Sequence, residues 1–140
     1  MADVLKHLQK LREHEKKQAQ MELAKAERAE EQQTARLDKN AQQVAQAREN
    51  TPEDDAAEVA RYHAFRLRME MARRRETGRL EKRKHDVLQA RDKLNTSVKN
   101  ARTMEQLVEN RAEEQAKEKR KKETALMDEL GLQNWWRKTG

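Results

Sequence analysis

The sequence contains no cysteine and very little glycine, proline or aromatic residue. Without cysteine, the chain can form neither a disulfide framework nor a thiolate metal site. Three glycines, one proline, two Trp, one Tyr and one Phe in 140 residues provide few tight turns and few bulky side chains for a compact core. The core is therefore expected to be a thin seam between long regular elements.

Long hydrophobic runs are also missing, since consecutive apolar residues number two or three at most. A transmembrane helix needs about 20 mainly apolar residues, so none is predicted. The first residues, Met1 to His7, include no hydrophobic stretch of the kind found in secretory signals. We therefore expect a cytoplasmic protein without a membrane span.

Charged residues make up 41% of the chain, and the remaining composition favours helix over disorder. High charge with few aromatic residues is typical of disordered chains, but such chains are usually rich in Pro, Gly and Ser. Ala, Glu, Lys, Arg, Gln and Leu dominate here, and these residues have the highest intrinsic helix propensities. The composition thus predicts long helices.

A first helix is predicted over residues 3–49, where no residue breaks a helix. Its apolar positions follow three- and four-residue steps: Val4, Leu8, Leu11, Ala19, Leu23, Ala26, Leu37, Ala41 and Val44. Polar residues fill the steps at Glu15, Glu30 and Gln33, which indicates a weak seam with a stutter.

A turn is predicted at residues 50–52 and a second helix at 53–130. Thr51 can cap this helix and Pro52 suits its first position, since proline lacks the N–H that would be unpaired there. Gly78 is an interior soft spot, and Gly131 is expected to end the helix before a tail at 131–140.

Two amphipathic helices joined by a short turn can bury their apolar stripes by folding back on each other. The predicted fold is all-α, a long two-helix antiparallel coiled-coil hairpin in which residue i lies near residue 101 − i. The C-terminal part of the second helix then projects beyond the first. Because the hairpin supplies its own partner helix, a monomer is expected.

No catalytic constellation is present, so we expect no enzyme activity and no cofactor. The chain has no glycine-rich phosphate loop and no His-Glu-x-x-His sequence. His7 and His14 lie one heptad apart, but two imidazoles without a well-placed carboxylate form a poor metal site, and no metal is expected.

A basic stretch runs from Arg61 to Arg91, with eleven Lys or Arg and four acids, a net charge of +7. Three interpretations are open: a solvated charged face, a docking surface for an acidic protein, or contact with nucleic acid phosphates. Consecutive basic residues point around the helix at about 100° steps, so neither Arg73 to Arg75 nor Lys82 to Lys84 forms a flat patch.

Two groups of large side chains are candidates for protein contacts. Phe65 and Met69 lie at helical spacing just after the turn, where they belong either to the seam or to an exposed binding knob. Trp135 and Trp136 lie beyond the predicted end of the second helix, where they either fold back or anchor a partner.

Three stretches resemble the FliJ/YscO family, the central stalk proteins of flagellar and virulence type III secretion systems. They are the leucine-spaced start from Val4 to Leu11, the aromatic-rich run Ala60 to Glu70, and Ala101 to Asn110 continued through Glu123 to Leu130 with its closing Asp128-Glu129. The chain length and the two-helix layout are similar as well.

The resemblance implies a hairpin that enters the hexameric export ATPase, promotes its assembly or activity, and links it to the export gate protein at the cytoplasmic base of a secretion apparatus. Secretion chaperones are further implied partners. The family's gate-binding pair would fall on Phe65 and Met69. Contacts with the ATPase would fall on the helix ends opposite the turn: Val4, Leu8, Leu11, Lys119, Arg120 and Lys121. The alternatives are a basic coiled coil associated with nucleic acid, or a structural coiled-coil spacer.

Overall fold

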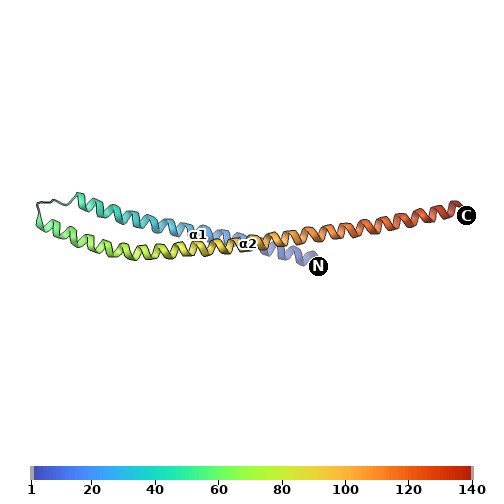
Figure 1. Ribbon diagram of the computed structural model, residues 1–140, viewed down its shortest axis with the longest axis horizontal. Helices are drawn as coiled ribbons and strands as arrows, with labels where there is room; N and C mark the ends of the chain where they lie inside the picture. The colour runs from blue at the N-terminus through green and yellow to red at the C-terminus, as the bar shows by residue number, and fades with distance from the viewer. Residues whose placement is uncertain (1, 140) are drawn as a thin grey trace. The chain divides into compact units, whose positions relative to one another are not determined.

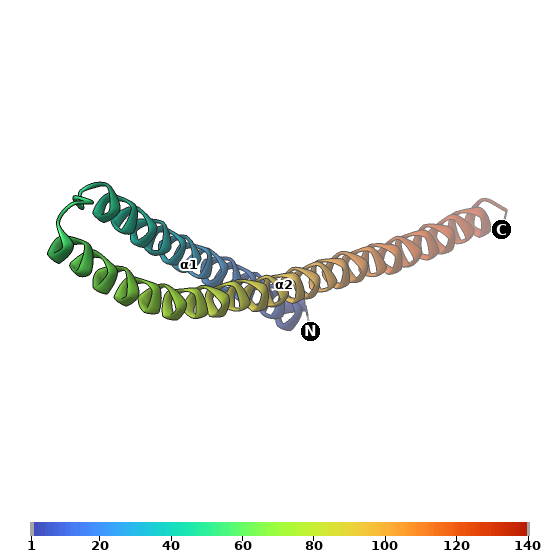
Figure 2. The same ribbon diagram turned by 60° about the vertical axis from the view of Figure 1, so that its left-hand side comes forward.

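The computed structural model describes residues 2–139 as two helices, α1 (Ala2–Glu49) and α2 (Ala56–Thr139), with no strand in that range. Figures 1 and 2 show α1 and α2 joined by one short turn. The prediction of an all-α two-helix hairpin is therefore confirmed. Contacts divide the chain into a hairpin unit, residues 16–96, and a terminal unit, whose described part is residues 2–15 and 97–139.

The turn at residues 50–55 is longer than the sequence predicted, because Asp55 caps α2 in place of Thr51. The Asp55 carboxylate accepts hydrogen bonds from the backbone N–H groups of Ala57 and Glu58, at 3.1 and 3.4 Å. Thr51 instead donates its hydroxyl to the Ala47 carbonyl at 2.6 Å, at the end of α1. Pro52 consequently lies in the turn, and α2 begins at residue 56 instead of residue 53.

The covered positions of α1 follow a heptad pattern without interruption. Partly or fully buried side chains occur at alternating steps of four and three residues: Leu5, Gln9, Arg12, Lys16, Ala19, Leu23, Ala26, Glu30, Gln33, Leu37, Asn40, Val44 and Ala47. Such alternation keeps one stripe of a helix facing its partner. The stutter predicted for this helix is therefore absent from α1, although polar residues occupy many of its seam positions.

A stutter lies in α2 instead, next to Gly78. Met69, Ala72, Glu76 and Leu80 are partly buried, and the last two steps of this series are both four residues long. An added four-residue step locally unwinds a coiled coil. Gly78 itself is exposed and helical, without a positive φ, so it does not break α2.

Hydrogen bonds between the helices define the register of the hairpin unit. Gln33 bonds to Glu76, and Asn40 bonds to the Met69 carbonyl, so the numbers of each pair add up to 109. The predicted sum of 101 was too small. The longer turn and the later start of α2 account for the direction of this difference. With the observed register, Ala19 and Ala90 lie at the same level, and both are buried.

In the terminal unit the covered part of α2 extends further than the sequence predicted. Ala101 is buried, and Met104 and Val108 are partly buried, whereas every described side chain from residue 109 to 139 is exposed. The sequence had predicted coverage only to the high nineties. The N-terminal residues of α1 that are covered in this unit include Leu5, Gln9 and Arg12.

The helix continues through Gly131 to Thr139, so the predicted tail at 131–140 is helical throughout its described part. A glycine stops a helix by adopting a left-handed conformation, and Gly131 has no positive φ. Its neighbours Leu130 and Leu132 are strong helix formers, which favours continuation over a stop. Trp135 and Trp136 consequently lie on α2 itself.

Replacing Gly78 with Ala is expected to stabilise the hairpin by up to about 1 kcal/mol, because alanine loses less backbone entropy in a helix. A methyl group at Gly78 would meet no heavy atom within 4 Å, so no strain opposes this gain. Thermal unfolding followed by circular dichroism measures the change. Gly131→Ala is the matched control, since it lies where no side chain is covered and should raise helix content with a smaller shift of the main transition. A lower midpoint for Gly78→Ala would contradict an unstrained helical site.

Candidate protein-binding surfaces

A polar layer crosses the seam of the hairpin unit at Gln33, which is only 4% exposed. The Gln33 side-chain amide donates to the Glu76 carbonyl oxygen at 3.0 Å and also to the Glu76 carboxylate. A buried amide needs such partners, because an unsatisfied buried donor costs about 1–3 kcal/mol. The layer therefore favours one register of α1 against α2.

Glu76 is the group whose ionisation this layer changes. The hydrogen bond from Gln33 is the largest cause of a lowered pKa for the Glu76 carboxyl, and the positive charges of Arg79, Arg36 and Arg75 act in the same direction. Partial burial opposes the shift but does not reverse it. Arg79 also forms an ion pair with Glu76 at 3.0 Å.

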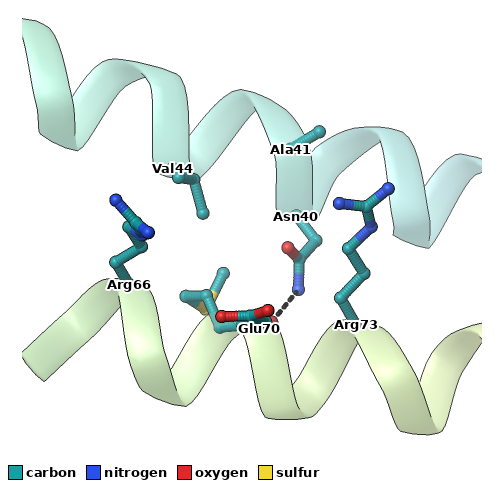
Figure 3. Close-up of a pocket in the computed structure, with 7 residues that line it drawn as sticks. Asn40, Ala41, Val44, Arg66, Glu70 and Arg73 are labelled. Atoms are coloured by element: carbon teal, nitrogen blue, oxygen red, sulfur yellow. Dashed lines mark hydrogen bonds between the residues drawn. The ribbon is translucent and has the colours of Figure 1, made fainter. Parts of the chain in front are cut away.

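A second polar contact lies nearer the turn, in an open groove between the helices (Figure 3). Asn40 donates its Nδ2 to the Met69 carbonyl at 3.4 Å. The groove is lined by Asn40, Ala41 and Val44 of α1 and by Arg66, Met69, Glu70 and Arg73 of α2. Figure 3 shows Arg66 and Arg73 extending from α2 toward α1 on either side of Glu70. The small side chains on α1 leave this part of the seam accessible.

The two residues predicted to bind an export gate, Phe65 and Met69, are partly buried on the seam face of α2. They therefore do not project as a fully exposed knob, although Met69 borders the open groove. The large apolar side chains that are exposed near the turn are Leu67 and Met71, at 61% and 62%. Sequence reasoning did not single these two out, because it followed only the stripe that faces α1.

The predicted ATPase-contacting residues all lie in the terminal unit. Val4, Leu8 and Leu11 are exposed at 60%, 38% and 49%, and their spacing puts them on one side of α1. Lys119 to Lys121 are exposed on α2, in the part of the helix where no side chain is covered. The structure thus leaves both groups accessible to a partner.

Trp135 and Trp136 are exposed at 57% and 65%, near the C-terminal end of α2. Their rings contact each other edge to face, with centroids 5.4 Å apart and an interplanar angle of 81°. Leu132, one turn earlier, is also exposed at 57%. Neither indole folds back onto covered side chains, so these residues stay candidates for a partner contact.

Residues 2–139 contain neither a metal-binding cluster nor a membrane-spanning stretch. No group of three or more His, Asp or Glu side chains there is arranged to hold a metal ion. No stretch of the two helices there is apolar enough over sufficient length to cross a bilayer.

Comparison with known proteins gives a family match that covers the chain from end to end. The profile of the family described as "Flagellar FliJ protein" matches residues 1–140. No curated protein and no solved structure matches the chain. The match confirms the family that the three sequence stretches resembled.

The hairpin is expected to lose stability in acid through Glu76. Its folded-state pKa lies below the unfolded value, so the ionised carboxylate stabilises the fold at neutral pH, and this contribution disappears as the pH falls through the folded-state pKa. The stability difference between the parent and Glu76→Gln should therefore shrink between neutral pH and about pH 3. Chemical denaturation at both pH values measures it.

Glu70→Gln is the control for this measurement. Glu70 pairs only loosely with Arg74, at 3.8 Å on the exposed side, and its replacement leaves the Gln33–Glu76 contact intact. If Glu76→Gln changes the pH dependence no more than Glu70→Gln does, the polar layer does not contribute as described.

Proposed function

The chain belongs to the FliJ family, and we propose that it is the stalk that binds the hexameric export ATPase and links it to the export gate. Family membership makes it a component of a flagellar type III export apparatus. The observation that carries the proposal is the match over all 140 residues, because it includes both helices and both helix ends. The proposed place of action is the cytoplasmic base of that apparatus, where secretion chaperones are further partners.

The ATPase contact is assigned to the terminal unit. Residues 109–139 of α2 have no covered side chain, and at 1.5 Å per residue this stretch is about 45 Å long. A single helix of this kind can enter the central opening of a ring without first separating from another helix. The basic run Lys119 to Lys121 would meet acidic side chains of the ring, while Val4, Leu8 and Leu11 supply apolar contacts.

The gate contact is assigned to Phe65 and Met69 in the hairpin unit. Both side chains keep part of their surface accessible, and Met69 borders the groove beside Ala41 and Val44. A gate segment lying along this groove would cover the exposed edges of both residues. The role needs no active site on this chain, because ATP hydrolysis takes place on the ATPase.

Phe65→Ala combined with Met69→Ala is expected to weaken gate binding by at least tenfold while leaving ATPase stimulation largely intact. Charge reversal at Lys119, Arg120 and Lys121 should do the opposite, reducing ATPase stimulation in a salt-dependent way. The measurements are ATP turnover of the purified ATPase and binding of the purified gate domain, with each variant.

A control is needed because Phe65 and Met69 also belong to the seam. Leu80→Ala combined with Leu94→Ala removes partly buried apolar groups from the same face of α2, further from the turn. This control should lower stability without the selective loss of gate binding. If it reduces gate binding as much as the first variant, or if the parent protein stimulates no ATPase, the stalk proposal is wrong.

A further inference from the structure

The side of α2 that faces away from α1 carries a second apolar series. Ala60, Ala64, Leu67 and Met71, the outer stripe, follow steps of four, three and four residues, and all four are exposed. Phe65 and Met69 occupy the opposite side of the helix, since a helix turns about 100° per residue. The outer stripe therefore has the spacing of a coiled-coil seam, but no helix of this chain covers it.

Cations at seven-residue intervals begin along one edge of the outer stripe and continue along α2 beyond its end. Arg61, Arg68, Arg75 and Lys82, the cation row, are all exposed. Residues seven apart lie almost above one another, about 10.5 Å apart along the axis, so these four charges form a line. Within residues 2–139, Arg68, Arg75 and Lys82 make no salt bridge, whereas Arg61 pairs with Glu58 at 2.9 Å.

We propose that the outer stripe and the cation row together form a docking surface for an amphipathic helix of a partner protein that carries acidic residues at heptad spacing. Leu67 and Met71 would insert between apolar side chains of that helix, and the alanines would allow its backbone to approach. Acidic side chains along one edge would face the cation row. The surface is distinct from the gate and ATPase contacts proposed above and does not depend on them.

Charge argues against a second copy of this chain as the occupant, and apolar area argues against a lipid surface. A second copy of this chain packed antiparallel would place its cation row against the same row, and like charges at such positions repel. If the second copy packed parallel, its cation row would face the edge of the outer stripe opposite the cation row. The acid on that edge is Glu70, which already pairs with Arg74 at 3.8 Å. An anionic lipid surface would neutralise the cations. Helices that bind membranes, however, present a wide apolar face with many bulky side chains. The outer stripe has only two large side chains, Leu67 and Met71.

The probe for the test is a synthetic peptide, three heptads long, with Leu at the two seam positions and Glu at the two flanking positions of each heptad. Its Glu residues repel one another, which suppresses self-association. Fluorescence anisotropy with the full-length protein should show saturable binding that weakens as salt is added. A peptide of the same composition in scrambled order should bind at least about tenfold more weakly.

Two variants separate the apolar and charged parts of the surface. Leu67→Ala with Met71→Ala should weaken peptide binding by about tenfold or more. Arg68→Glu with Arg75→Glu should abolish binding of the Glu peptide and create binding of a peptide with Lys at the flanking positions. All four residues are exposed, so circular dichroism should show unchanged helix content.

Matched controls place the same changes elsewhere in the hairpin unit. Met21→Ala with Leu88→Ala removes exposed apolar groups, at 71% and 58%, from other surfaces. Lys25→Glu with Lys39→Glu changes the net charge equally on exposed positions of α1. Both control variants should bind the Glu peptide within about twofold of the parent.

Three outcomes would overturn the proposal. The first is the absence of peptide binding, and the second is equal weakening by the control variants, which would indicate a diffuse charge effect. The third is that the parent protein binds vesicles of phosphatidylcholine and phosphatidylserine but not the peptide, and that the variant with Leu67→Ala and Met71→Ala no longer binds the vesicles. This result would assign the surface to anionic lipid.

Discussion

The hydrogen bonds of the Gln33 side chain to Glu76 set the register on which the hairpin unit depends. Many other seam positions carry Ala, Leu or Val, and apolar contacts of this kind tolerate a shift of the helices. A shift would leave the Gln33 amide buried without an acceptor, at a cost of about 1–3 kcal/mol. The polar layer consequently exchanges some stability for a single alignment, as polar seam residues do in coiled coils.

The register in turn determines which residues of α2 face α1 and which face outward. With Asn40 at the level of Met69, the seam face of α2 includes Phe65 and Met69, and the opposite face presents Leu67 and Met71. The stutter at Gly78 lies close to the Gln33 layer, where α2 has one additional four-residue step relative to the regular heptad.

Composition and periodicity were sufficient to predict two long helices and their antiparallel pairing, while the resemblance of three sequence stretches pointed to the family. They were insufficient for the turn, because Thr51 and Asp55 are both good caps and only tertiary structure decides between them. The predicted register of α1 against α2 was wrong for the same reason.

Gly131 did not end the helix as predicted, since a glycine flanked by leucines in a long helix has no contact that imposes the left-handed conformation. Candidate partner residues were found only where they were large or clustered in sequence, so the cation row at seven-residue spacing was missed.

Between residues 60 and 71, α2 carries apolar residues on two opposite sides of its axis. Phe65 and Met69 are partly buried on the side that faces α1, whereas Leu67 and Met71 are exposed on the other side. A helix with one partner needs one stripe, and a helix that is apolar on opposite sides is either buried or contacts a second element. In the hairpin unit α2 is not buried, because Leu67 and Met71 are exposed. Two apolar sides over this stretch are therefore the pattern expected of a helix that pairs with α1 on one face and, as proposed above, with another protein on the other.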